Sequence, residues 1–122
     1  MRLGTLMAFI AVLALGQLPS TANAFACPKH FAAAQAAIDK VTKDMKGAMS
    51  KKMAAAGMAA DMALVHALLD DAKMMLAGAK HNHAKPQGKY DHGRAIAKAD
   101  AAKGYATAAD IYHWKLMGKM KK

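Results

Sequence analysis

The stretch HNHAKPQGKYDH, residues 81–92, separates two long Ala-rich segments of the chain. Pro86 and Gly88 near its centre both interrupt helices. Before and after the stretch, apolar residues recur every three or four positions, as they do on one face of an α-helix. We therefore predict that residues 80–92 form a His-rich loop, and that the helix after this loop returns along the helix before it.

Glycine positions suggest the remaining helix boundaries. The first helix is expected over residues 29–56, with a kink at Gly47, and the second over residues 58–79. The third is expected over residues 90–117, or as two shorter helices if Gly104 divides it. Few residues are β-branched or aromatic, so no strand pattern competes. The predicted fold class is all-α, an up-and-down bundle of three long or four shorter helices. The predicted core faces are Phe31, Ala34, Ile38, Val41 and Met45 in the first helix, Met62, Val65, Leu69, Ala72 and Leu76 in the second, and Ile96, Ala99, Tyr105 or Ala106, Ala109, Ile111 and Trp114 in the third.

Residues 1–24 have the pattern of an export signal. Arg2 is positive, residues 6–15 are mostly apolar, and residues 22–24 (ANA) form a small-residue cleavage site. The apolar run is too short to span a bilayer, and no later segment is a candidate transmembrane helix. We expect residues 25–122 to form a single helical-bundle domain that is periplasmic or secreted.

The formal net charge of the chain is +10. In the cytosol a basic Ala/Lys-rich chain would suggest nucleic acid, but an exported protein does not meet the chromosome. One alternative function is a cationic structural or surface-binding protein without a cofactor, whose attraction to anionic surfaces weakens in salt. An Ala-rich core buries little area per residue, so a metal ion, another ligand or a second copy in a homodimer would add stability.

The chain lacks the residue patterns of common enzymes. Ser50 is the only serine after the predicted cleavage site, and no Gly-x-Ser-x-Gly motif surrounds it. There is no Gly-rich phosphate loop and no Cys-x-x-Cys-His haem-attachment motif. All eight acidic residues are Asp, whereas helical di-iron sites use Glu. We therefore expect a protein that is not an enzyme and has no ferritin-like centre.

Two short motifs are candidate metal sites. His81, His83 and His92 are three of the six histidines, and imidazole is the commonest metal ligand in proteins. The alternative is a solvated polar loop that happens to contain histidine. Cys27 and His30 form a Cys-x-x-His pair, in which thiolate and imidazole are also candidate ligands. Because Cys27 is the only cysteine, it cannot close a disulfide within the chain; a thiol, a link to a second chain, a lipid anchor and a metal ligand remain.

Methionine recurs at helical spacing beside other donors. Two strips of one composition occupy different predicted helices: Met62, His66 and Asp70 on the second, and Asp110, His113 and Met117 on the third. Thioether sulfur suits Cu(I), and a carboxylate beside each imidazole can fix its tautomer. The alternative is that methionine fills irregular gaps in an Ala-rich core.

The export signal, the small helical bundle and the helix-borne histidines together resemble small periplasmic metal-binding proteins of the SmbP type. That resemblance implies a periplasmic protein that binds metal for sequestration or delivery. The methionines favour copper, with nickel or zinc next. Residues 112–115 (YHWK), near the end of the last helix, are similar to the haem-binding end of soluble periplasmic b-type cytochromes of four-helix-bundle form. This second resemblance implies haem, held by His113 and a methionine, as the alternative cofactor.

Overall fold

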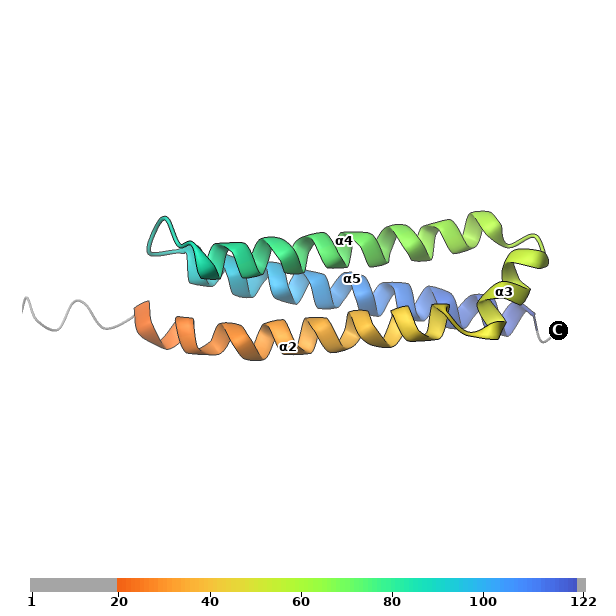
Figure 1. Ribbon diagram of the computed structural model, residues 1–122, viewed down its shortest axis with the longest axis horizontal. Coiled ribbons are helices and arrows are strands. Elements are labelled where there is room, and N and C mark those ends of the chain that lie inside the picture. Colours follow the sequence, from red (N-terminus) through yellow and green to blue (C-terminus); the bar gives the residue numbers. More distant parts are fainter. Residues whose placement is uncertain (1–19, 121–122) are drawn as a thin grey trace, which may run out of the picture.

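The computed structural model describes residues 20–120, without the side chains of residues 20–25 and 48–49. Within that range the chain forms four helices and no strand: α2 (Ser20–Met45), α3 (Ala48–Ala55), α4 (Ala59–Ala84) and α5 (Asp91–Lys119). The three long helices pack side by side, and the short α3 crosses one end of the bundle (Figure 1). The all-α prediction is confirmed. Residues 1–19, which hold most of the predicted export signal, lie outside the described residues.

Polar cross-links between helices give the direction of each helix. His30 pairs with Asp100 and Lys40 with Asp110, both from α2 to α5 and both 70 residues apart. A constant offset means that α2 and α5 run parallel. Between α5 and α4 the order reverses: Lys98 contacts Asn82, whereas Lys119 contacts Asp61. The topology is therefore up, down and up, with α3 serving as the crossing between α2 and α4.

The core consists of one apolar stripe on each long helix. The stripe on α5 is almost entirely alanine, which brings the neighbouring helices close together. The predicted faces of the first two helices are confirmed, with Phe31 and Met45 only partly buried. The third face was wrong at two positions, since Ile111 is 50 % and Trp114 is 57 % exposed. The buried apolar residues are Cys27, Ala34, Ile38, Val41, Met53, Met62, Val65, Leu69, Ala72, Leu76, Ala79, Ala95, Ala99, Ala102, Ala106, Ala109 and Leu116.

The fourth helix arises at Gly47 and not at Gly104. The first helical segment ends at Met45, and Gly47 has extended ψ before α3 begins. A Cβ at Gly47 would lie 3.2 Å from the Asp44 carbonyl oxygen, so a side chain is crowded there. Gly104, by contrast, lies on the exposed side of α5, and the helix continues through it. The buried alanine stripe on the opposite face offsets the intrinsic cost of one helical glycine, about 1 kcal/mol.

The turn between α3 and α4 requires Gly57. Its φ is +80°, a conformation that glycine adopts without steric cost. The Gly57 amide donates to the Ala54 carbonyl, and the Met58 amide donates to the Met53 carbonyl. These two bonds form a Schellman motif, which satisfies the last carbonyl groups of α3 and turns the chain into α4.

The predicted His-rich loop over residues 80–92 is too long at both ends. Helix α4 continues to Ala84, and α5 begins at Asp91, so the loop contains only residues 85–90. His81 and His83 are therefore helical residues, and His92 lies in the first turn of α5. Pro86 is the residue that ends the helical pattern, because it cannot supply the next backbone donor. None of the helices in the described part of the chain combines the length and hydropathy needed to cross a bilayer.

Candidate metal centre

The end of the bundle that carries the 85–90 loop, here called the loop end, contains the only cysteine. Cys27 lies on α2 with no exposed surface. Its Sγ donates weakly to the His92 carbonyl oxygen at 3.6 Å. Burial raises the pKa of the Cys27 thiol above its usual 9.0, and a backbone hydrogen bond offsets only part of that rise. A metal ion that binds here must therefore displace a proton.

Two imidazoles face this thiol from the other long helices. His83 comes from the last turn of α4 and His92 from the first turn of α5. Their ring centroids are 5.3 Å apart at an interplanar angle of 66°. Phe31, one turn after Cys27 on α2, packs edge-on against His83 with centroids 5.5 Å apart. Phe31 thus provides an apolar wall that restricts the orientation of one imidazole.

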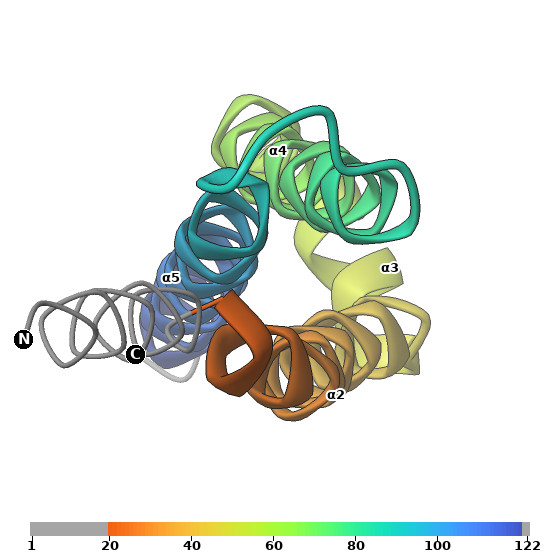
Figure 2. The same cartoon turned by 90° about the vertical axis from the view of Figure 1, so that its left-hand side faces the viewer.

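Cys27, His83 and His92 offer one sulfur and two nitrogen atoms that all lie within 4.8 Å of one another. A tetrahedral ion with metal–nitrogen and metal–sulfur bonds of ordinary length holds its donors about 3.5 Å apart. Metal binding therefore needs the three donors to approach by at most about 1 Å, which small side-chain rotations provide. Each donor comes from a different helix, and all three helices meet at this end (Figure 2). A buried Cys/His/His group of this kind can hold a metal ion.

The imidazole nitrogens at this site carry a second sign of a ligand. Among the described residues, the Nδ1 atoms of His83 and His92 are buried without a hydrogen-bond partner. Leaving a polar group buried and unpaired costs about 1–3 kcal/mol. A metal ion removes that cost by using the nitrogen lone pair of a neutral imidazole. A bound metal ion could therefore satisfy these imidazoles.

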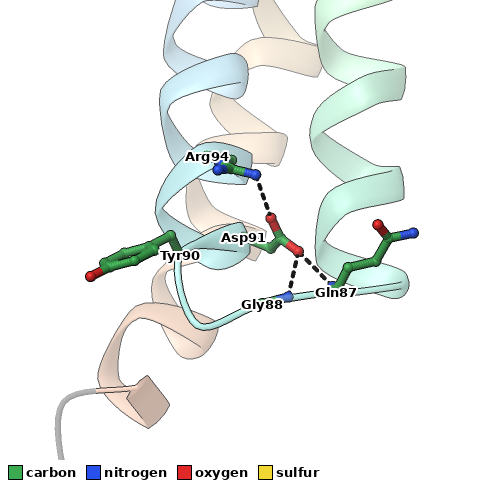
Figure 3. A pocket seen from close by; sticks show the side chains of 5 residues that line it. All are labelled: Gln87, Gly88, Tyr90, Asp91 and Arg94. Carbon is green, nitrogen blue, oxygen red and sulfur yellow. Dashed lines mark hydrogen bonds and ion pairs between the residues drawn. The ribbon is translucent and has the colours of Figure 1, made fainter.

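The 85–90 loop is held by Asp91, the residue before His92. The Asp91 carboxylate accepts hydrogen bonds from the backbone amides of Gln87 and Gly88, and Arg94 contacts it at 3.2 Å (Figure 3). The hydrogen bond from the Gln87 amide is the largest factor that lowers the pKa of Asp91 below 3.8. Burial raises this pKa, but the Gly88 amide and Arg94 lower it further, so the net shift is downward. These three residues and Tyr90 line a small pocket with Asp91. Because its carboxylate is already engaged, Asp91 acts as a clamp that fixes the start of α5 and hence His92.

No family model, curated protein or solved structure matches this chain. The resemblances to SmbP-type proteins and to b-type cytochromes therefore stay predictions. The description of the candidate site therefore rests on the geometry of its donors.

Three of the predicted histidine ligands lie elsewhere. His81 and His66 are exposed on α4. His30 turns away from Cys27, and its Nδ1 lies 2.6 Å from Asp100 Oδ1 on α5. The Cys-x-x-His pair thus contributes its cysteine to the Cys/His/His group and its histidine to a hydrogen bond between α2 and α5.

The structure also divides the two predicted donor strips, Met62 with His66 and Asp70, and Asp110 with His113 and Met117. Asp110 accepts from Lys40 at 2.7 and 2.8 Å, and this contact is the main reason that the pKa of Lys40 is raised above 10.5. Met62 belongs to the buried core, and Met117 is partly buried against it. His113 is 1 % exposed, and its Nε2 lies 3.1 Å from Ser50 Oγ. Haem iron bound through Nε2 would have to replace this hydrogen bond, and the haem alternative remains a prediction.

The three grouped donors share one sequence signal. Cys27 extends the buried stripe of α2 by four residues before Phe31, and His83 extends that of α4 by four residues after Ala79. His92 precedes Ala95 by three residues on α5, so it too continues a stripe. His81 lies off this register. Core periodicity therefore favours His83 over its neighbour His81, but the same spacing also fits His30 and His66, so it does not identify the group by itself.

Proposed function

We propose that this protein binds a transition-metal ion through Cys27, His83 and His92, for sequestration or delivery in the periplasm or outside the cell. Copper is the preferred ion, with nickel or zinc next. The observation that supports this proposal is the convergence of one sulfur and two nitrogen atoms within 4.8 Å, from three helices.

The charge of the donor set supports copper. Thiolate and imidazole suit soft and borderline ions, and Cu(I) with one thiolate and two neutral imidazoles forms a complex without net charge. A divalent ion in the same place leaves one uncompensated positive charge, which is costly where Cys27 is fully buried. Three protein ligands also leave one position open in a tetrahedral ion. An open position lets a partner's ligand take over the metal, which suits delivery.

The test is a titration of the full-length metal-free protein with Cu(I), Ni(II), Zn(II) and, as an optical probe of thiolate ligation, Co(II). We expect one ion per chain to bind at Cys27, His83 and His92 and to give a thiolate-to-metal charge-transfer band. Cys27→Ser should abolish that band, and His83→Gln should weaken binding by more than about tenfold, the scale on which even the partners of metal ligands act.

The matched control is His81→Gln, which removes an exposed imidazole two residues from His83 on the same helix. Its affinity should equal that of the wild type. Equal losses of affinity in His81→Gln and His83→Gln would show that the ion binds nonspecifically to surface histidines. The absence of binding to any of the four ions would favour the cofactor-free cationic protein.

A further inference from the structure

The opposite end of the bundle, here called the α3 end, contains a third buried imidazole nitrogen. His113 on α5 is almost fully buried, and its Nδ1 has no hydrogen-bond partner among the described residues. Its Nε2 faces Ser50 Oγ on α3, a contact 63 residues apart in sequence. The α3 end lies a bundle's length from the Cys/His/His group (Figure 1).

The hydrogen bonds around Ser50 decide the tautomer of His113. Ser50 Oγ lies 3.4 Å from the Asp44 carbonyl oxygen, which can only accept a hydrogen bond. The Asp44 carbonyl offers an acceptor for the Ser50 hydroxyl, and when the hydroxyl donates there Oγ accepts from His113 Nε2. The proton then resides on Nε2, and Nδ1 carries a bare lone pair. This is how a hydrogen-bonded partner prepares an imidazole for a metal ion.

Thioether sulfur is the other donor in this interior. Met117 follows His113 by four residues on α5, so the two side chains occupy the same helix face. Met53 follows Ser50 by three residues on α3 and is fully buried. Further methionines that belong to or pack against the same core cluster are Met45, Met58, Met62 and Met120.

The charges near the α3 end select the type of ion. Imidazole and thioethers are neutral, and the carboxylates nearby are already paired: Asp110 and Asp44 with Lys40, and Asp61 with Lys119. The solvation cost of a buried ion grows with the square of its charge, so a divalent ion without an anionic ligand is disfavoured relative to a monovalent one. A soft monovalent ion suits both the donors and the charge.

We propose that the α3 end is a second, independent site for a soft monovalent cation, Cu(I) or its surrogate Ag(I), held by His113 Nδ1 and the thioethers of Met117 and Met53. Helix α3 is the entry point. Of its described side chains only Ser50 and Met53 are buried, so few contacts hold it in place. Because it lacks a thiolate, this site binds more weakly than the loop end does.

The test uses the full-length protein with the loop end disabled by Cys27→Ser, His83→Gln and His92→Gln. This background should bind one Ag(I) and no Zn(II). Adding His113→Gln retains an amide that can donate to Ser50 but removes Nδ1, and should weaken Ag(I) binding by more than about tenfold. Met117→Leu and Met53→Leu should act in the same direction. Met74→Leu is the matched control, because Met74 is 67 % exposed on α4, and it should change nothing.

A second measurement does not depend on how the variants fold. In the wild type, Ag(I) added after the loop end has been filled by a first equivalent of Ag(I) should shift the methyl resonances of Met53 and Met117 and leave that of Met74 in place. Failure of the background variant to bind Ag(I), equal affinity with and without His113→Gln, or unmoved Met53 and Met117 methyl groups would each overturn the second site. None of these results bears on the loop end, so the two proposals fail separately.

Discussion

The loop end and the α3 end both contain imidazoles with a buried Nδ1 that has no partner among the described residues, but they differ in their other donors. At the loop end, a thiol that can ionise lies within 4.8 Å of two imidazoles. At the α3 end, a single buried imidazole is present, and the methionines of the apolar core are neutral thioethers. The two ends therefore differ in the charge of their donors, and this charge, more than the number of donors, would decide which ions each proposed site accepts.

The largest expected effect is stabilisation by metal at the loop end. A ligand at a thousand times its dissociation constant stabilises the folded state by about 4 kcal/mol. We expect a stabilisation of that size with Zn(II), measured by urea unfolding, and its loss in Cys27→Ser. Because His113 is not one of the three loop-end donors, His113→Gln should keep this stabilisation. Equal stabilisation in Cys27→Ser would mean that Zn(II) binds elsewhere.

The next effect tests whether the two ends are independent. Met53→Ala removes a fully buried side chain from the α3 end and should lower the free energy of unfolding by about 3 kcal/mol. Zn(II) affinity at the loop end should stay at the wild-type value. Met74→Ala, at an exposed position, should change stability by less than about 0.5 kcal/mol. A parallel loss of Zn(II) affinity in Met53→Ala would show that the ends are coupled.

The thiol should give the loop end a pH dependence that the α3 end lacks. The pKa of Cys27 lies above 9.0, so at neutral pH the metal displaces the thiol proton. Affinity should therefore rise about tenfold for each pH unit as long as the pH is below that pKa. Competition titrations at about pH 7 and about pH 8 would measure this change in metal affinity. Cys27→Ser should have a shallower slope, and an unchanged slope would exclude the thiol as the proton source.

The smallest effect concerns the clamp beside His92. The folded-state pKa of Asp91 is lowered, so its contribution to stability is present above the ordinary value of 3.8 and is lost as the pH falls through the lower folded value. Asp91→Asn should lower the urea midpoint of the metal-free protein at pH 7, and the difference from the wild type should fade in acid. A difference that persists at the lowest pH would contradict the clamp. Metal affinity should fall only slightly, because no ligand is removed.

Helical periodicity predicted the faces of α2 and α4 because each long stripe there contains large apolar residues. It failed at Ile111 and Trp114 because the stripe of α5 is alanine, so small residues and not large ones mark its core face. The break at Gly47 and the continuity at Gly104 could not be distinguished from sequence. Their difference depends on tertiary packing, with crowding against Asp44 in one case and open space in the other.

The candidate site was predicted in part. The sequence singled out Cys27, His83 and His92 but assigned them to two separate motifs, with His30 and His81 as partners. Proximity in sequence misled because a helix turns neighbours onto different faces: His81 and His83 are both helical, and only His83 continues the buried stripe. The tautomer of His113 could not be predicted from the sequence, because it depends on the contacts of Ser50 with His113 and with the Asp44 carbonyl of α2.

The spacing of the loop-end ligands along the chain has a kinetic consequence. His83 and His92 belong to one hairpin joined by a short loop, whereas Cys27 comes from a distant helix. Closing the hairpin costs less chain entropy than docking α2 does. A metal ion can therefore bind first to His83 and His92, and Cys27 then binds it when α2 docks. Release would follow the reverse order, so the rate at which α2 undocks from the hairpin would set the residence time of the proposed metal ion.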